Sequence, residues 1–126
     1  MRQQLAERTM AFQQAYRIAT YLPQDAVDRV LAGICAVVPL RYGRYDCSAW
    51  WIGGGTEQYQ PIEGAKPSHG EVGKVSRVPI TRLEFCVPRD LQLARRVIDA
   101  GLRPNHPWEE PAIFVDEILV DIRAHP

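Results

Sequence analysis

The chain contains one strand–helix pattern twice, and this repeat restricts the folds open to it more than any other feature. Residues 16–22 alternate between two faces, a proline follows, and residues 24–38 carry apolar side chains at helical spacing. Residues 82–87 alternate in the same way, a proline again follows, and residues 89–100 show helical spacing. Period-two alternation is typical of a strand, and a stripe at 3.6-residue spacing is typical of an amphipathic helix. The sequence therefore predicts two strand–helix units.

A further strand follows each unit. Residues 42–52 are rich in aromatic side chains and predict a second strand, which the glycines at 53–55 are expected to end. A long connection over residues 56–74 comes next, and residues 113–122 predict a final strand. This order predicts an α+β fold of the ferredoxin-like split βαβ type (βαββαβ). Right-handed crossovers place strands one and three in the centre of an antiparallel sheet and both helices on one face.

Prolines and glycines mark the expected ends of the elements. Pro39 cannot continue a helix and is expected to end the first one. Gly101 is well placed to cap the C-terminus of the second helix. Residues 75–79 are expected to resume pairing ahead of the third strand. Residues 1–14 have only a weak apolar stripe and predict a short helical or frayed N-terminal extension, so that residues 15–126 form a single domain.

Composition excludes several classes of protein. Lys and Arg number 15, and so do Asp and Glu, so the formal net charge is zero and no nucleic-acid partner is expected. No apolar run approaches the roughly 20 residues of a membrane span, and the N-terminal residues are not expected to act as a signal peptide. The three cysteines are odd in number and form no Cys-x-x-Cys pair, which argues against a disulfide framework and a Cys-rich zinc site. A cytoplasmic protein with reduced thiols is expected.

The predicted topology leaves one sheet face without helices. That face would carry Arg17, Ala19, Tyr21, Arg82, Glu84 and Cys86. Its mixed polarity and aromatic content suit a subunit interface as well as they suit solvent. The last strand lies at an edge, and an uncovered edge invites pairing with another chain. We therefore expect a homo-oligomer.

Three stretches resemble a known family in their order and spacing. They are YGRYDCSAW at 42–50, YQPIEGAKPSHGEVGKV at 59–75 and HPWEEPAIFV at 106–115. Together they resemble the insertion domain of the dimetal-binding Ngg-interacting factor three family, as a stand-alone copy. The third stretch is also similar to the divalent-cation tolerance (CutA) family, whose fold is shared by the PII signal proteins. This resemblance implies a CutA/PII-like sheet, a trimer, and effector binding through long loops.

The resemblance has limits that bear on activity. The family's dinuclear metal site lies in two flanking domains that the matching residues do not include, so its metallohydrolase-like activity is not expected here. Trp108 stands where the family usually has Tyr, and His69 stands where an apolar residue is usual. Fold similarity alone does not transmit function.

The segment at 106–110 is the first candidate site. One imidazole and two carboxylates, from His106, Glu109 and Glu110, could hold a borderline divalent ion. Three ligands from one short extended segment cannot all converge, so others would come from Asp46, Cys47, His69 or Glu71. The alternative is structural: His106 and the glutamates fix a sharp turn into the last strand, or pair with Arg across an interface.

The long connection is the second candidate. Its ligand-binding residues would be Glu63, Gly64, His69, Gly70, Glu71 and Gly73. Glycines let backbone N–H groups approach a ligand closely. The connection lacks the Gly-Lys-Ser/Thr of a P-loop, and it could equally pack on a neighbouring subunit. Trp108 could line a pocket, although large aromatic residues more often fill cores and interfaces. Cys47 is expected to be a packed thiol rather than a nucleophile.

These features favour a non-enzymatic, oligomeric binding or regulatory module for a divalent metal ion or a small effector. One alternative is a protein-interaction domain with no ligand, and another is a metal-dependent hydrolase. No catalytic residue is assigned, because no Ser-His-Asp order and no metalloprotease spacing of histidines occurs.

Overall fold

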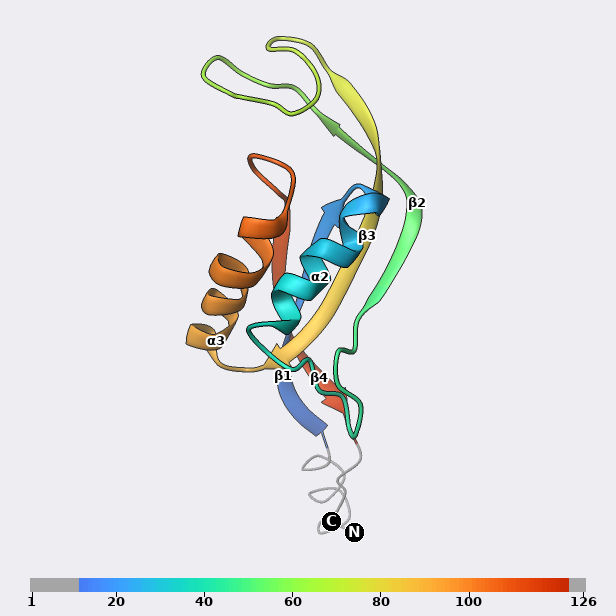
Figure 1. Ribbon diagram of the computed structural model, residues 1–126, viewed down its shortest axis with the longest axis vertical. Coiled ribbons are helices and arrows are strands. Elements are labelled where there is room, and N and C mark those ends of the chain that lie inside the picture. Colours follow the sequence, from blue (N-terminus) through green and yellow to red (C-terminus); the bar gives the residue numbers. More distant parts are fainter. Residues whose placement is uncertain (1–11, 123–126) are drawn as a thin grey trace.

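A computed structural model of the protein describes residues 12–122. Four strands form one antiparallel sheet: β1 (Phe12–Leu22), β2 (Trp50–Tyr59), β3 (Ser76–Pro88) and β4 (Ile113–Asp121). Their order is β2-β3-β1-β4, so strands one and three are central, as the sequence predicted. Two helical segments, beginning with α2 (Val27–Cys35) and α3 (Leu91–Arg96), lie on one side of this sheet (Figure 1). The ferredoxin-like prediction is confirmed.

The core lies between the sheet and the helices. Ile18 and Leu22 of β1 and Phe85 of β3 are fully buried on the face that the repeat had marked as apolar. Because side chains alternate along a strand, the residues between them point to the other face. The helices contribute Val30, Ile34, Ala94, Val97 and Leu102.

The first helical segment is shorter than its apolar stripe. A 3-10 turn, η1 (Gln24–Ala26), follows Pro23 and leads into α2, which ends at Cys35. The amides of Val37 and Val38 both donate to the carbonyl of Ile34, so the chain already turns ahead of Pro39. The prediction of a helix to residue 38 was therefore too long.

The second helical segment is longer than predicted. The Asp90 side chain caps α3 by accepting from the amides of Gln92 and Leu93. The helix continues as a π segment, η2 (Val97–Leu102), and a 3-10 turn, η3 (Arg103–Asn105). Gly101 is buried within η2, so the prediction that it caps the helix was wrong.

The second strand lies later in the chain than predicted. Residues 42–49 precede it as a loop, and β2 runs through the three glycines to Tyr59. The register shifts between Ile52 and Gly55, which is a β-bulge, and Gly54 takes a φ of +87°. A Cβ on Gly55 would collide with the side chain of Ile80 on β3. The glycines therefore bend the strand instead of ending it.

Two other strands are longer than their patterns. Residues 75–79 and 82–87 belong, from Ser76 onward, to the single strand β3. Strand β1 begins at Phe12, so residues 12–14 are strand and not a helical extension. Residues 1–11, which hold the rest of the predicted extension, lie outside the described residues.

The other face of the sheet carries no helix. In the register, Trp50 of β2 is opposite Glu84, and Phe114 of β4 is opposite Ala19. Trp50 is 47% exposed and Phe114 is 53% exposed. We call this surface the open sheet face; it also carries Arg17, Tyr21, Ile52, Arg82 and Cys86. No helix between residues 12 and 122 has the length and apolar character needed to cross a membrane.

Candidate ligand-binding cavity

The loop at residues 60–75, between β2 and β3, contacts the segment that precedes β4. The amide of Lys66 donates to both carboxylate oxygens of Glu109, at 3.1 and 3.2 Å. Within the loop, the Tyr59 hydroxyl donates to the carbonyl of His69 at 2.5 Å. In Figure 1 the loop arches over the end of the molecule where the chain passes from η3 to β4. The two stretches singled out in the sequence are therefore neighbours.

A cavity of about 580 Å³ lies between them. Its walls include Glu57 and Tyr59 at the end of β2, Glu63 and His69 of the loop, and Trp108. Glu109, Glu110 and the rest of the stretch 60–68, apart from Lys66, complete the lining. A volume of this size falls in the usual range for small-molecule sites, roughly 300–1,000 Å³.

The cavity is acidic. Four glutamates line it, at 57, 63, 109 and 110, and among the described residues no Lys or Arg side chain does. Burial raises the pKa of Glu57 above its ordinary value. A carboxylate that loses hydration without gaining a cation is less stable as an anion. The acidic lining of the cavity therefore favours a positively charged group over an anion.

His106 does not line the cavity. The residue is 8% exposed, and Nε2 lies 2.8 Å from the carbonyl oxygen of Tyr21. Its Nδ1 accepts from the amide of Trp108 at 3.1 Å. The carbonyl can only accept, so Nε2 carries the proton and Nδ1 does not. Both ring nitrogens are used to hold the chain, which supports the structural alternative for this residue.

Burial also keeps His106 neutral. It lowers the pKa of the imidazole below its ordinary value of 6.5, and the nearby Arg29 charge lowers it further. The hydrogen bond to Tyr21 opposes these effects but does not outweigh them.

The predicted metal set is not assembled. Glu109 binds a backbone amide and His106 has no free nitrogen. In the stretch 12–122 no group of three or more His, Cys, Asp or Glu side chains could hold a metal ion. The described residues therefore do not fit the divalent-ion site that the side chains at 106–110 suggested.

The structure separates the other predicted residues. Glu63, Gly64 and His69 line the cavity. Glu71 instead pairs with Lys74 at 2.9 Å on the surface, and Gly70 and Gly73 shape the loop through positive φ angles of +93° and +82°. Asp46 and Cys47 belong to the connection between α2 and β2. That connection lies at the opposite end of the molecule from the 60–75 loop (Figure 1).

The sequence analysis missed Glu57 and Tyr59, because it placed residues 56–74 in a connection. Their alternation with Thr56 and Gln58 was the available signal, since it continues the period of a strand beyond the glycines.

Comparison with known proteins agrees with this architecture. No protein-family model matches the chain. A GTP cyclohydrolase 1 type 2 homolog of Mycobacterium bovis is 35% identical over 95 residues, which are 75% of this chain and 24% of that protein. The Bacillus subtilis homolog is 33% identical over 96 residues, 76% of this chain and 25% of that protein. A Bacillus cereus protein related to NIF3 shares the fold, with a TM-score of 0.69 and 23% identity over 88% of this chain and 28% of that chain.

This chain is similar to one domain of NIF3-related proteins. It spans about a quarter of the length of the curated relatives that it matches. The family resemblance expected from the three sequence stretches is confirmed. The similarity covers this one domain, and the activity of the longer proteins is not assigned to it.

Proposed function

We propose that this domain is a non-enzymatic binding module, which takes a small organic cation in the cavity between the 60–75 loop and the segment at 106–110. The carrying observation is the lining of the cavity: four glutamates with no opposing Lys or Arg side chain among the described residues. A phosphate-bearing effector would meet repulsion there at neutral pH.

The aromatic walls support an organic cation rather than a bare one. Tyr59 and Trp108 present ring surfaces beside the carboxylates. Aromatic faces attract ammonium and guanidinium groups, by about 0.5–2 kcal/mol depending on desolvation. A ligand with a charged head and an apolar body would satisfy both kinds of wall.

Ligand binding would tie the loop to the body of the domain. The bond from Lys66 to Glu109 already joins them, and a ligand between the walls would add contacts to each side. This offers a regulatory output, since the shape of the loop would then report occupancy. The alternative of a metal-dependent hydrolase gains no support from the described side chains, and an interaction domain without a ligand remains the competing function.

Thermal unfolding tests the proposal. Choline, agmatine and spermidine serve as cations, 3,3-dimethylbutanol as a neutral isostere of choline, and AMP and ATP as anions; Mn and Zn salts with and without chelator complete the panel. A ligand at about 100 times its dissociation constant adds about 2.7 kcal/mol of stability, which raises the unfolding temperature by several degrees in a domain of this size. We expect a shift from at least one organic cation and none from the isostere.

Variants locate the site. Trp108→Ala and Glu110→Gln are expected to abolish the shift. Glu71→Gln is the matched control, because Glu71 is an exposed acid of the same loop outside the cavity. No shift from any member of the panel, including metals and nucleotides, would reject the binding function and favour the interaction domain. A shift from AMP or ATP alone would reject the charge assignment.

A further inference from the structure

The loop between α2 and β2, residues 39–48, is closed by its own backbone. The amide of Cys47 donates to the carbonyl of Pro39 at 2.8 Å, and the amide of Ser48 donates to the carbonyl of Leu40 at 3.0 Å. A further pair of backbone hydrogen bonds joins residues 42 and 45 at the tip, at 2.7 and 3.0 Å. These bonds give the tip of the loop a defined shape.

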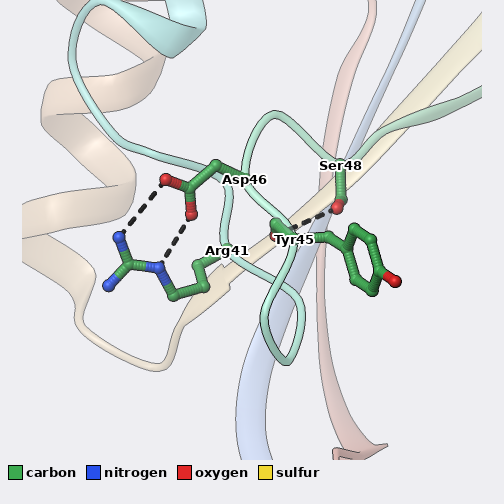
Figure 2. A network of polar contacts seen from close by, with 4 residues as sticks. All are labelled: Arg41, Tyr45, Asp46 and Ser48. Atoms are coloured by element: carbon green, nitrogen blue, oxygen red, sulfur yellow. Dashed lines mark hydrogen bonds and ion pairs between the residues drawn. The ribbon is translucent and has the colours of Figure 1, made fainter.

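Side chains reinforce this closure. Arg41 binds the Asp46 carboxylate through Nε at 2.7 Å and a terminal nitrogen at 3.3 Å, and the Ser48 hydroxyl donates to the carbonyl of Tyr45 at 3.3 Å (Figure 2). Backbone and side chains together hold the loop, and with it Tyr42, in one arrangement.

Tyr42 connects the tip of this loop to the sheet. Its hydroxyl donates to the carbonyl of Asp121, the last residue of β4, at 3.2 Å. Its ring meets the ring of Trp50, the first residue of β2, edge to face with the centroids 5.8 Å apart. Because β2 and β4 are the outer strands of the sheet, Tyr42 contacts both edges of the sheet at this end of the molecule.

A second cavity, of about 360 Å³, lies beside Tyr42 on the open sheet face. The two central strands contribute Arg17, Glu84 and Cys86 to its lining, and Tyr42 and Trp50 add aromatic walls. Residues 118–121 of β4 complete the lining, and three of these four are apolar. The volume falls within the usual range for small-molecule sites, roughly 300–1,000 Å³. This cavity shares no lining residue with the acidic one.

Arg17 is the cation of this second cavity, and it lacks a counter-ion. Its Nε is buried and has no hydrogen-bond partner among the described residues. Asp116 is opposite Arg17 in the register with β4, yet no ion pair joins the two within the stretch 12–122. Glu84 already pairs with Arg82 at 3.1 Å. A cation that is partly removed from water without a neutralising group is costly, and an anion beside it offsets part of that cost.

We propose that this cavity is a second ligand site, which takes a small organic carboxylate with an apolar body. The carboxylate accepts hydrogen bonds from the guanidinium of Arg17, whose planar fork suits two carboxylate oxygens. The apolar body lies against the rings of Tyr42 and Trp50. The closed 39–48 loop forms one wall before the ligand arrives, which lowers the cost of ordering on binding.

Asp121 distinguishes two kinds of carboxylate. It is the other acid of the lining besides Glu84, and no Lys or Arg side chain pairs with it in the part of the chain that the structure describes. An amino acid would bring an ammonium group towards Asp121, whereas a simple carboxylic acid would not. Both kinds of ligand share the contact with Arg17, and the experiment separates them.

Isothermal titration calorimetry of the full chain tests the proposal. The carboxylate probes are 3-phenylpropionate and 4-methylpentanoate. Phenylalanine and leucine add an ammonium group to the same skeletons, and the two corresponding amides are the neutral isosteres. We expect at least one carboxylate or amino acid to bind and its amide not to bind. Tighter binding of the amino acid than of the matched simple acid would assign a zwitterionic ligand, and the reverse order would assign a simple carboxylate.

Variants tie the binding to Arg17. Arg17→Gln is expected to weaken it roughly 10- to 100-fold, as for the loss of hydrogen bonds to a charged group. Arg17→Lys keeps the charge without the planar fork and should fall between Arg17→Gln and the wild type. Arg77→Gln is the matched control, because Arg77 is an exposed arginine of β3 that lines neither cavity. Thermal unfolding checks that each variant is folded.

Nuclear magnetic resonance of the wild-type protein gives a readout that needs no variant. The bound carboxylate should shift the indole signal of Trp50, which lines this cavity, and leave that of Trp108, which lines the acidic one. A shift confined to Trp108 would overturn the proposal.

Three calorimetric results would also overturn it. They are equal binding by Arg17→Gln and the wild type, equal binding of an amide and its carboxylate, and no binding of any carboxylate or amino acid at millimolar concentration. In the last case, an oligomer that dissociates in Arg17→Gln would show that a second copy of the chain covers Arg17 instead.

Discussion

At the scale of the residue, His106 shows what a sequence can and cannot predict about a candidate site. The sequence offered a structural alternative for this residue, a sharp turn into the last strand, and the hydrogen bonds of the imidazole support it. The direction of the imidazole could not be predicted, because its partner carbonyl belongs to Tyr21, at the far end of the chain in sequence. A histidine and two glutamates in a short segment look like metal ligands, whereas the fold uses the imidazole to hold the turn.

His106 should make the stability of the domain depend on pH. Its pKa is lowered in the folded protein, so the unfolded chain takes up a proton first as the pH falls. The contribution is complete above the unfolded pKa of about 6.5, and it is lost as the pH falls towards the folded value. Urea unfolding at two pH values on either side of that point should show this loss in the wild-type protein.

A substitution isolates the effect. His106→Ala should lower the free energy of unfolding at neutral pH by about 1–3 kcal/mol, because it leaves the Tyr21 carbonyl without its partner. The variant should also lose less stability between the two pH values. His69→Ala is the control, since His69 is exposed. An unchanged pH dependence in His106→Ala would contradict the assignment.

At the scale of the element, Gly33 and Gly101 have a packing role that the sequence pattern did not indicate. Gly101 looked like a helix cap because it follows an amphipathic stretch. In the structure it faces Gly33 of α2, where a Cβ on Gly33 would lie 2.6 Å from the carbonyl oxygen of Gly101. The pairing joins two helices that the sequence showed only as separate periodic stretches. The prediction that the glycines at 53–55 end the second strand was wrong for a similar reason. A run of glycines marks a β-bulge as readily as the end of a strand, so the sequence alone does not distinguish the two.

The helix contact leads to a prediction that opposes helix propensity. Gly33→Ala should favour the isolated helix by about 1 kcal/mol. We nevertheless expect it to destabilise the protein by up to about 2 kcal/mol, because overpacking a tight contact costs roughly 1–3 kcal/mol and outweighs the gain in helix propensity. Chemical denaturation measures the net change in the free energy of unfolding. Ala32→Gly, at an exposed site in the same helix, reports propensity alone, and a Gly33→Ala protein more stable than wild type would refute the close packing.

At the scale of the whole molecule, the sequence predicted the layer of helices on one face of the sheet. It predicted only the central part of the open sheet face. The alternation at residues 16–22 and 82–87 correctly assigned both faces of the central strands. Trp50, Ile52 and Phe114 extend the open face onto the edge strands, where the sequence boundaries were less certain. Arg17 lies on this face, and its Nε is the one buried side-chain nitrogen or oxygen among the described residues that lacks a hydrogen-bond partner. A second copy of the chain could cover these rings and supply an acceptor.

Self-association through the open face is therefore a prediction for the whole domain. Sedimentation velocity over a concentration series should show an oligomer, and Trp50→Ala should weaken it by about 2 kcal/mol, as for a central aromatic residue of an interface. Leu91→Ala is the control, because Leu91 is 71% exposed on the helical side. A wild-type protein that stays monomeric at every concentration would rule this interface out.

The pairing of Phe12 with Asp121 places the two described ends of the chain next to each other, at the same end of the sheet. A domain whose entry and exit are neighbours can be spliced into a surface loop of another protein without stretching either partner. The same geometry allows the domain to be inserted into other proteins, in evolution or by protein engineering. Grafting residues 12–122 between two turn residues of an unrelated host would carry the cavity along with its core intact.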